Sequence, residues 1–173
     1  LALVDPMTIP DNLTSFYYTN IEIKKNLEKK IKFNNDILHQ SKLINYFNGD
    51  YSKAKIEKDI NNFLKKIKRN KKYLLSKKDH IFLESLRSDG IKIDKKYEDL
   101  IKNDASEIPT DIQVMINNNE KGAALLRIIE LIGQDKLERI DDDTIYFIIS
   151  ALNQLDIDII RNKILLKVLP LKV

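Results

Sequence analysis

The chain has 173 residues, of which 43% are hydrophobic and 32% charged, with a formal net charge of +4 and no cysteine. This length fits one domain that buries a core of its own, and the lack of cysteine excludes disulfides, cysteine nucleophiles and cysteine-ligated metal sites. Only four glycines and four prolines interrupt the chain, which is too few for the frequent turns of an all-β fold.

The positive charge is concentrated in one part of the chain. Residues 21–103 hold 22 Lys and Arg against 12 Asp and Glu, a balance of +10, and the other residues hold 8 against 14, a balance of −6, which together give +4. A basic region favours anionic partners. The abundance of Lys, Asn and Ile is also typical of an AT-rich bacterial genome, in which lysines form an ordinary solvated surface. Both interpretations stay open at this stage.

The sequence begins with Leu1 instead of Met, which predicts either a removed leader or a piece of a longer protein. The expected compartment is therefore the bacterial cytoplasm or, if a signal peptide was removed, the periplasm. No stretch approaches the roughly 18 uncharged apolar residues of a membrane span, so no transmembrane segment is predicted.

The first 50 residues predict two helices after an extended lead-in over residues 1–9. Pro10 or Asp11 opens the first helix, whose apolar face follows a spacing of three and four and carries Leu13, Phe16, Tyr17, Ile21 and Leu27. A turn at residues 34–36 precedes the second helix, over residues 37–47, which is predicted to end at Gly49 because glycine is favoured just after a helix.

Residues 50–101 predict three further helices. Asp50 is expected to cap the first of them, which closes in the charged run 65–72 and has an apolar stripe of Tyr51, Ala54, Ile60, Phe63, Leu64 and Ile67. The pattern Ser76-x-x-Asp79 predicts a capping box at the start of the next helix, which ends at Ser88-Asp89-Gly90. A short helix is predicted to start near Asp94.

The last third of the chain predicts a short helix and then three apolar ones. Residues 103–107 are polar and aperiodic and are predicted to be a linker, and Pro109 fits the first turn of a helix that ends at residues 117–119. The apolar helices cover residues 120–132, 144–155 and 157–169, with Asn119 and the aspartates 141–143 as predicted caps and Pro170 as the stop. Short connections between apolar helices predict antiparallel neighbours.

These elements predict an all-α fold in a single domain, residues 1–173, with a basic helical part over 1–103 and an apolar helical part over 104–173. About seven to nine helices are expected, arranged as stacked antiparallel hairpins.

Residues 47–54, Phe-Asn-Gly-Asp-Tyr-Ser-Lys-Ala, resemble the turn of a tetratricopeptide repeat, in which a small residue such as Ala54 allows the second helix to pack closely. The segment 122–133 is similar to the closing repeats of uncharacterised bacterial helical-repeat proteins. The chain departs from the tetratricopeptide pattern at Ser41 and Lys42, which stand where an aromatic residue and a Leu-Gly pair are expected, and no proline closes the unit. The resemblance implies a short right-handed superhelix that binds other proteins and carries no catalytic residues.

The sequence contains no recognisable catalytic, cofactor or metal motif. His39 and His80 lack metal-ligand spacing and are expected to be surface or boundary polar residues. The aspartates 141–143 do not follow a calcium-loop pattern and are interpreted as helix caps. Phosphate-binding glycine loops and the Gly-x-Ser-x-Gly motif are absent. We therefore predict a protein that is not an enzyme. A carboxylate-dependent hydrolase stays open as a weaker alternative, and it would require two carboxylates that face each other in a deep cleft.

Two functions remain as predictions. The first is a protein–protein interaction or scaffold module, in which Tyr18 and Tyr51 are the expected solvent-facing contacts with an unidentified protein or peptide. The alternative is binding of nucleic acid or an anionic surface through the basic region 65–78. Tyr73 and Phe63 lie near that region for base stacking, although Phe63 fits the core better. The basic candidates are Lys65, Lys66, Lys68, Arg69, Lys71 and Lys72.

Overall fold

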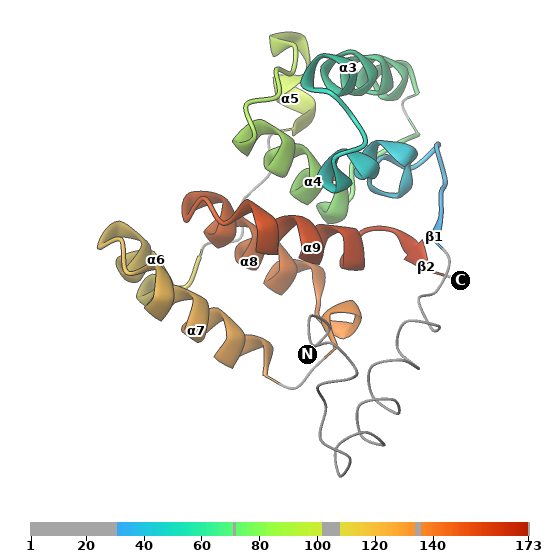
Figure 1. The fold of residues 1–173 in the computed structure, drawn as a ribbon. Helices are drawn as coiled ribbons and strands as arrows, with labels where there is room; N and C mark the ends of the chain where they lie inside the picture. Colours follow the sequence, from blue (N-terminus) through green and yellow to red (C-terminus); the bar gives the residue numbers. More distant parts are fainter. Residues whose placement is uncertain (1–30, 71, 102–107, 134–135, 173) are drawn as a thin grey trace, which may run out of the picture. The chain divides into compact units, whose positions relative to one another are not determined.

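The computed structural model describes residues 31–70, 72–101, 108–133 and 136–172 (Figure 1). The chain divides into two units, residues 1–32 with 172–173, and residues 33–171. The basic and apolar parts on the two sides of residue 103 therefore belong largely to one unit. The predicted lead-in, the first helix and the linker 103–107 lie outside the described residues.

The described part of the larger unit is helical, which confirms the all-α fold class. Its α-helices are α3 (Lys53–Arg69), α4 (Lys77–Ser88), α5 (Glu98–Ile101), α6 (Thr110–Asn117), α7 (Lys121–Ile132), α8 (Asp142–Gln154) and α9 (Asp158–Val168). Short 3₁₀ helices are η3 (Leu38–Gln40), η4 (Lys42–Asn48), η5 (Lys95–Tyr97) and η6 (Leu137–Arg139). Two two-residue strands, β1 (Ile31–Lys32) and β2 (Leu171–Lys172), pair with each other.

Most helix ends lie where the sequence predicts them. The capping box of α4 is present, with the Ser76 side chain accepting from the Asp79 N–H and the Asp79 side chain accepting from the Ser76 N–H. Asp141 caps α8 by accepting a hydrogen bond of 2.9 Å from the Thr144 N–H. Gly49, with a φ of 89°, ends η4 in the left-handed region, which glycine enters at no steric cost.

Three predicted starts are corrected by the structure. Ser52 caps α3 in place of Asp50, because its hydroxyl accepts from the Lys55 N–H. Pro109 occupies the cap position of α6 and not its first turn. Glu120 precedes α7 in place of Asn119, and its side chain makes no capping hydrogen bond.

The helix predicted over residues 37–47 is divided into η3 and η4 at Ser41. This residue has extended backbone angles, and its hydroxyl donates to the Leu38 carbonyl at 2.7 Å while accepting from the Leu43 N–H at 3.3 Å. A serine that bonds its neighbouring backbone groups in this way competes with the helical ladder. The prediction of one continuous helix is therefore wrong at this position.

The apolar stripe of α3 is rotated from the predicted one. Its buried residues are Ile56, Ile60, Leu64 and Ile67. Tyr51 and Phe63 are only partly buried, and Ala54 is exposed. Ala54 therefore does not mediate a close helix–helix contact of the kind that the tetratricopeptide resemblance implies.

The core is built around α4, which packs against α8 and η3, while α8 and η4 both pack against α9. Phe82 and Leu83 of α4 and Ile148 of α8 are fully buried, and the Phe82 ring meets the Phe47 ring of η4 edge to face at 5.6 Å. Burial of each such side chain contributes about 1.5–3 kcal/mol. The apolar helices predicted at the C-terminus thus supply much of the core that α4 completes.

A buried arginine joins α9 to the end of α4. The Arg161 side chain is 1% exposed. Its guanidinium donates to the Asp89 carboxylate at 2.6 Å and lies 3.0 Å from the Asp158 carboxylate. Its Cζ lies 5.8 Å from the centre of the Phe47 ring. Because a buried charge without a partner is strongly unfavourable, the correct placement of α9 depends on Asp89.

The two carboxylates on Arg161 provide a matched test of this dependence. We expect Asp89→Ala to lower the free energy of unfolding by about 3 kcal/mol, since it leaves the buried guanidinium without its enclosed partner. Asp158 is 60% exposed, so Asp158→Ala should cost at most about 1 kcal/mol. Urea denaturation of both variants measures the difference, and equal losses would contradict it.

Candidate functional site

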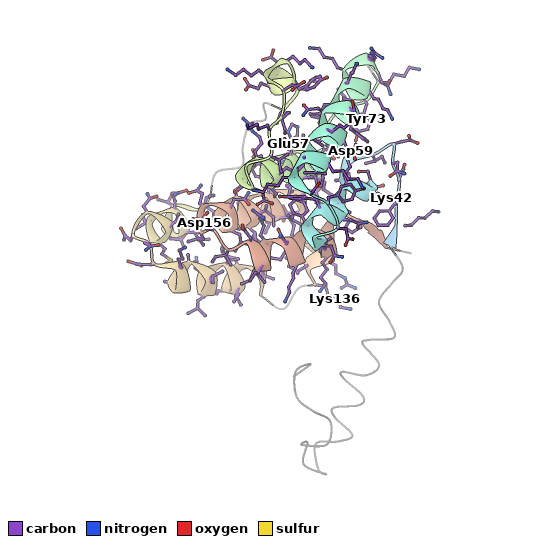
Figure 2. The ribbon with its side chains drawn as sticks, turned by 45° about the horizontal axis from the view of Figure 1, so that its top comes forward. Lys42, Glu57, Asp59, Tyr73, Lys136 and Asp156 are labelled. Atoms are coloured by element: carbon purple, nitrogen blue, oxygen red, sulfur yellow. The ribbon has the colours of Figure 1, made fainter. Side chains whose placement is uncertain are left out.

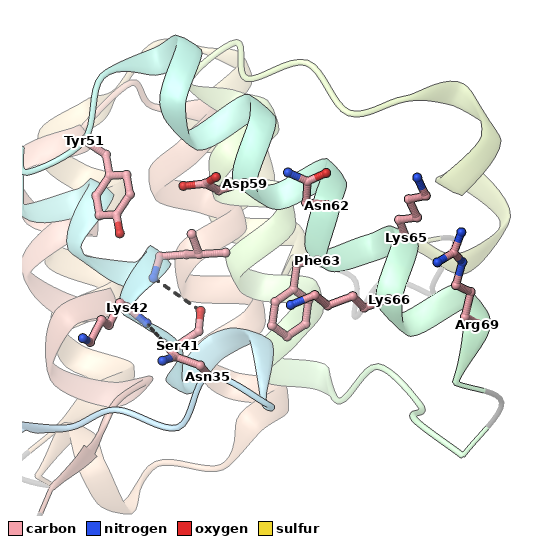
Figure 3. A pocket seen from close by; sticks show the side chains of 11 residues that line it. Asn35, Ser41, Lys42, Tyr51, Asp59, Asn62, Phe63, Lys65, Lys66 and Arg69 are labelled. Atoms are coloured by element: carbon pink, nitrogen blue, oxygen red, sulfur yellow. Dashed lines mark hydrogen bonds between the residues drawn. The ribbon is translucent and has the colours of Figure 1, made fainter.

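An open pocket of about 600 Å³ lies between α3 and the segment that precedes it (Figure 3). Charged, amide and aromatic side chains line it: Asn35, Ser41, Lys42, Leu43, Tyr51, Asp59, Asn62, Phe63, Lys65, Lys66 and Arg69. Helix α3 contacts η4, and Figure 2 labels Lys42 of η4, Asp59 of α3 and Tyr73, which follows α3. We refer to this site as the basic pocket.

One wall of the basic pocket is a face of α3. Asp59, Asn62, Phe63, Lys66 and Arg69 are spaced by three or four residues, which places them on one side of an α-helix. This side adjoins the stripe that α3 buries in the core. The helix is therefore held by its apolar stripe while it presents polar and cationic side chains to the pocket.

Side-chain to backbone hydrogen bonds fix the opposite wall. The Asn35 carboxamide oxygen accepts from the Lys42 N–H at 3.1 Å, and the Ser41 hydroxyl accepts from the Leu43 N–H (Figure 3). Both bonds stabilise the start of η4, from which Lys42 reaches the pocket. The break at Ser41 thus positions a cation that no local sequence pattern assigns to the site.

Two aromatic side chains line the pocket, and both are held from outside it. Phe63 meets the Tyr73 ring edge to face at 6.4 Å. The Lys55 ammonium lies 4.5 Å from the centre of the Tyr51 ring. In Figure 3 the Tyr51 hydroxyl points toward Lys42, and Phe63 and Lys66 both extend from α3.

The pocket carries a clear positive charge. Lys42, Lys65, Lys66 and Arg69 face a single carboxylate, Asp59, which leaves a formal charge of +3. None of these five side chains forms an ion pair within the described ranges of the chain. A concave site with one predominant sign of charge attracts ligands of the opposite sign.

The structure brings together half of the side chains predicted to bind a partner. Tyr51, Lys65, Lys66 and Arg69 line the basic pocket, whereas Lys72 is exposed outside it. Lys68 is on another side of α3, where its ammonium donates to the Lys96 carbonyl at 3.0 Å. Tyr18 and Lys71 lie outside the described residues.

Sequence reasoning missed several residues of the pocket. Asp59 and Asn62 share the three- and four-residue spacing of Phe63 and Lys66, so this pattern on α3 could have indicated them. Asn35 and Lys42 could not be found in this way, because they belong to a segment that meets α3 only through the fold.

The basic region 65–78 is not one continuous cationic surface. Lys77 forms an ion pair with Asp143, and Lys78 lies 3.4 Å from the Asp142 carboxylate. Asp141 thus caps α8, while Asp142 and Asp143 in its first turn pair with lysines at the start of α4. The net positive charge of the region is therefore reduced at its C-terminal end.

His39 and His80 are each only 7% exposed, so the expectation of surface or boundary positions is wrong for both. The His39 Nδ1–H donates to the Asp79 carboxylate at 2.8 Å, and its Nε2 lies 3.2 Å from the Gln40 amide nitrogen. The Ser76 hydroxyl lies 3.3 Å from the same Nδ1. In a Ser-His-Asp triad the serine faces Nε2, so this arrangement does not activate Ser76.

Asp79 is the centre of this buried cluster. Besides the His39 ring, its carboxylate accepts from the N–H groups of His39 and Ser76 at 2.9 Å each and from the Tyr73 hydroxyl at 3.1 Å. Burial raises the pKa of Asp79, but the hydrogen bonds from His39 and Ser76 outweigh it and hold the pKa below its ordinary value. Burial, together with the Asp79 charge, raises the pKa of Tyr73 to about 12.

Metal-ligating side chains do not cluster in the part of the chain that the structure describes, where no group of three or more His, Asp or Glu could hold an ion. No helix within the described ranges is both long and apolar enough to span a bilayer.

Comparison of the chain with protein-family models, curated proteins and solved structures finds no match in any of the three. The tetratricopeptide resemblance of residues 47–54 therefore stays a prediction, and the site is interpreted from its geometry.

The lowered pKa of Asp79 predicts acid sensitivity. Its carboxylate stabilises the fold fully above the unfolded-state pKa of about 3.8, and this contribution is lost as the pH falls through the lower folded-state value. We expect Asp79→Asn to lower the free energy of unfolding by about 1–3 kcal/mol at pH 7, because it places an N–H donor among donors. The difference in the free energy of unfolding between Asp79→Asn and the unmodified chain should become smaller between about pH 4 and pH 2. The reason is that the Asp79 carboxylate of the unmodified chain begins to lose its stabilising effect near its ordinary pKa of about 3.8.

Urea denaturation across this pH range measures the effect. Asp36→Asn, at an exposed aspartate, is the control and should change the free energy of unfolding little at any pH. A loss for Asp79→Asn that is independent of pH would show that the carboxylate charge does not supply the stabilisation.

Proposed function

We propose that this protein is a non-enzymatic helical module that binds an acidic segment of a partner protein in the basic pocket. The observation that carries the proposal is the set of four cations, without an ion-pair partner among the described residues, that surrounds two aromatic rings in a cavity of about 600 Å³. A carboxylate-bearing peptide supplies the opposite charge, and its apolar side chains can pack on Tyr51 and Phe63.

The amide and acid groups of the pocket favour a peptide over a simple anion. Asn35 and Asn62 can each donate to and accept from a peptide backbone. Asp59 repels phosphate and carboxylate groups but can accept a peptide N–H. A site with acceptors among its cations is therefore better suited to a polypeptide than to a chain of phosphates.

The surrounding fold supports the same proposal. The basic pocket is formed within the unit of η4 and α3, whose connecting turn resembles that of a tetratricopeptide repeat, a family of protein-binding helical hairpins. We propose that the hairpins form a short right-handed stack, as in that family. We also propose that the protein comes from a bacterium with an AT-rich genome. The non-enzymatic assignment is supported by His39, whose ring nitrogens face Asp79 and Gln40 and not a cleft.

Binding of nucleic acid or an anionic surface is the second candidate function. A pocket lined by both rings and cations, such as Phe63 and Lys66, is typical of single-strand binding. Against it, Lys77 and Lys78 pair with aspartates, and Lys53 and Lys68 donate to backbone carbonyls. Of the other cations in the described part of this region, Lys65, Lys66 and Arg69 line the basic pocket, and Lys72 is exposed outside it.

Charge reversal inside and outside the pocket tests the proposal. We expect fluorescein-labelled octaglutamate to bind the chain, and Lys66→Glu or Arg69→Glu to weaken binding about tenfold or more, which corresponds to about 1.4 kcal/mol. Lys72→Glu makes the same charge change at an exposed position outside the pocket and should weaken binding less than about twofold, as expected for a screened surface charge. Fluorescence anisotropy measures all three.

The same assay separates the two candidate functions. An oligo-dT single strand and vesicles rich in phosphatidylserine serve as competitors. If either displaces octaglutamate at lower concentration than unlabelled octaglutamate does, the second candidate is favoured. Equal weakening by Lys66→Glu and Lys72→Glu would show that the basic pocket is not the binding site.

A further inference from the structure

The Asp59 carboxylate in the basic pocket has no partner of opposite charge. Within the described ranges it forms no ion pair, although its side chain is half-buried. Lys55 lies one turn earlier on α3 and has the right spacing for an intrahelical pair, but its ammonium lies over the Tyr51 ring at 4.5 Å. Because a partly buried carboxylate is normally paired or hydrogen-bonded, we expect a ligand to supply the missing donor.

The charges on the α3 wall of the pocket are separated along the helix. Lys65, Lys66 and Arg69 lie in the last five residues of α3. At a rise of about 1.5 Å per residue, Lys66 is about 10 Å and Arg69 about 15 Å from Asp59 along the axis. Figure 3 shows Asp59 and Arg69 at opposite ends of this wall. Lys42, the fourth cation, is on the opposite wall. The α3 wall therefore has an acidic end and a basic end.

An aromatic ring lies beside the acidic end. Phe63 follows Asp59 by one helical turn, and both line the pocket, so the two side chains share one face of α3. An arginine guanidinium is planar, and it can form two parallel hydrogen bonds with a carboxylate or stack on an aromatic ring. A lysine ammonium lacks this planar shape. Asp59 and Phe63 together are therefore best suited to an arginine side chain.

We propose that the segment bound in the basic pocket carries, besides its acidic residues, an arginine that pairs with Asp59 and stacks on Phe63. This inference rests on the proposed function, because it concerns the same pocket and specifies the ligand further. An extended peptide advances about 3.3 Å per residue. The acidic residues that meet Lys66 and Arg69 therefore lie about three to five residues from the arginine.

The proposal and simple charge attraction predict opposite results. An arginine makes a peptide less negative, so a pocket that responds only to net charge would bind it less tightly. The probes are fluorescein-labelled Arg-Gly-Gly-Glu-Glu-Glu and the same peptide with citrulline, a neutral side chain of similar shape, each also made in reversed order. In at least one order, we expect the arginine peptide to bind about fivefold more tightly, the upper end for a partly exposed ion pair. Fluorescence anisotropy measures the affinities.

Asp59→Asn should abolish the preference for arginine over citrulline. It should also tighten binding of octaglutamate, because it removes a repulsive charge. Asp156→Asn, at an exposed aspartate between α8 and α9, is the matched control and should keep the preference. Since Asp59 has no ion-pair partner in the described fold, Asp59→Asn should unfold at about the same urea concentration as the unmodified chain. Altered binding then reports on the pocket and not on folding.

Lys66→Glu separates this inference from the proposed function. It should weaken binding of both hexapeptides equally and leave their affinity ratio near about fivefold, because the effects of separated sites add. If octaglutamate does not bind, the proposed function fails and this inference fails with it. If octaglutamate binds and Lys66→Glu weakens it, but citrulline peptides bind as tightly as arginine peptides in both orders, only the arginine inference is overturned. A preference that persists in Asp59→Asn also overturns it.

Discussion

The Asp79 carboxylate is the interaction on which the arrangement around the basic pocket depends. It accepts hydrogen bonds from the backbone and ring of His39, from the Ser76 backbone and from the Tyr73 hydroxyl, while it is itself almost completely buried. One side chain thereby joins η3, the loop before α4 and α4 itself. Since a buried carboxylate is stable only when its hydrogen bonds are formed, these segments are constrained together.

The pocket inherits its geometry from this cluster. The Tyr73 hydroxyl also accepts from the Leu38 N–H at 3.0 Å, and the Tyr73 ring supports Phe63. Leu38 is followed by the Ser41 break that turns Lys42 toward α3. The cations of the site are thus carried on a framework in which Asp79, Tyr73 and Ser41 bond to one another's segments and not to these cations.

The sequence predicted the helices well and the site only in part. Local signals such as the Ser76–Asp79 capping box, the Gly49 stop and the Asp141 cap act within a few residues, and the structure confirms them. The burial of His39 and the role of Lys42 depend on contacts between residues far apart in the chain, which periodicity does not reveal. The misplaced start at Asp50 has another cause, since Ser52 competes with it as a cap at nearly the same position.

The burial of Arg161 has a consequence for how the chain can be shortened. Its guanidinium fills a site between the end of α4 and η4, and it enters that site only with the last helix of the unit. A chain that ended before Asp158 would retain Asp89 and the Phe47 ring but lose the cation that both contact. The C-terminal helix is thus an integral part of the smallest folded unit and not a removable extension.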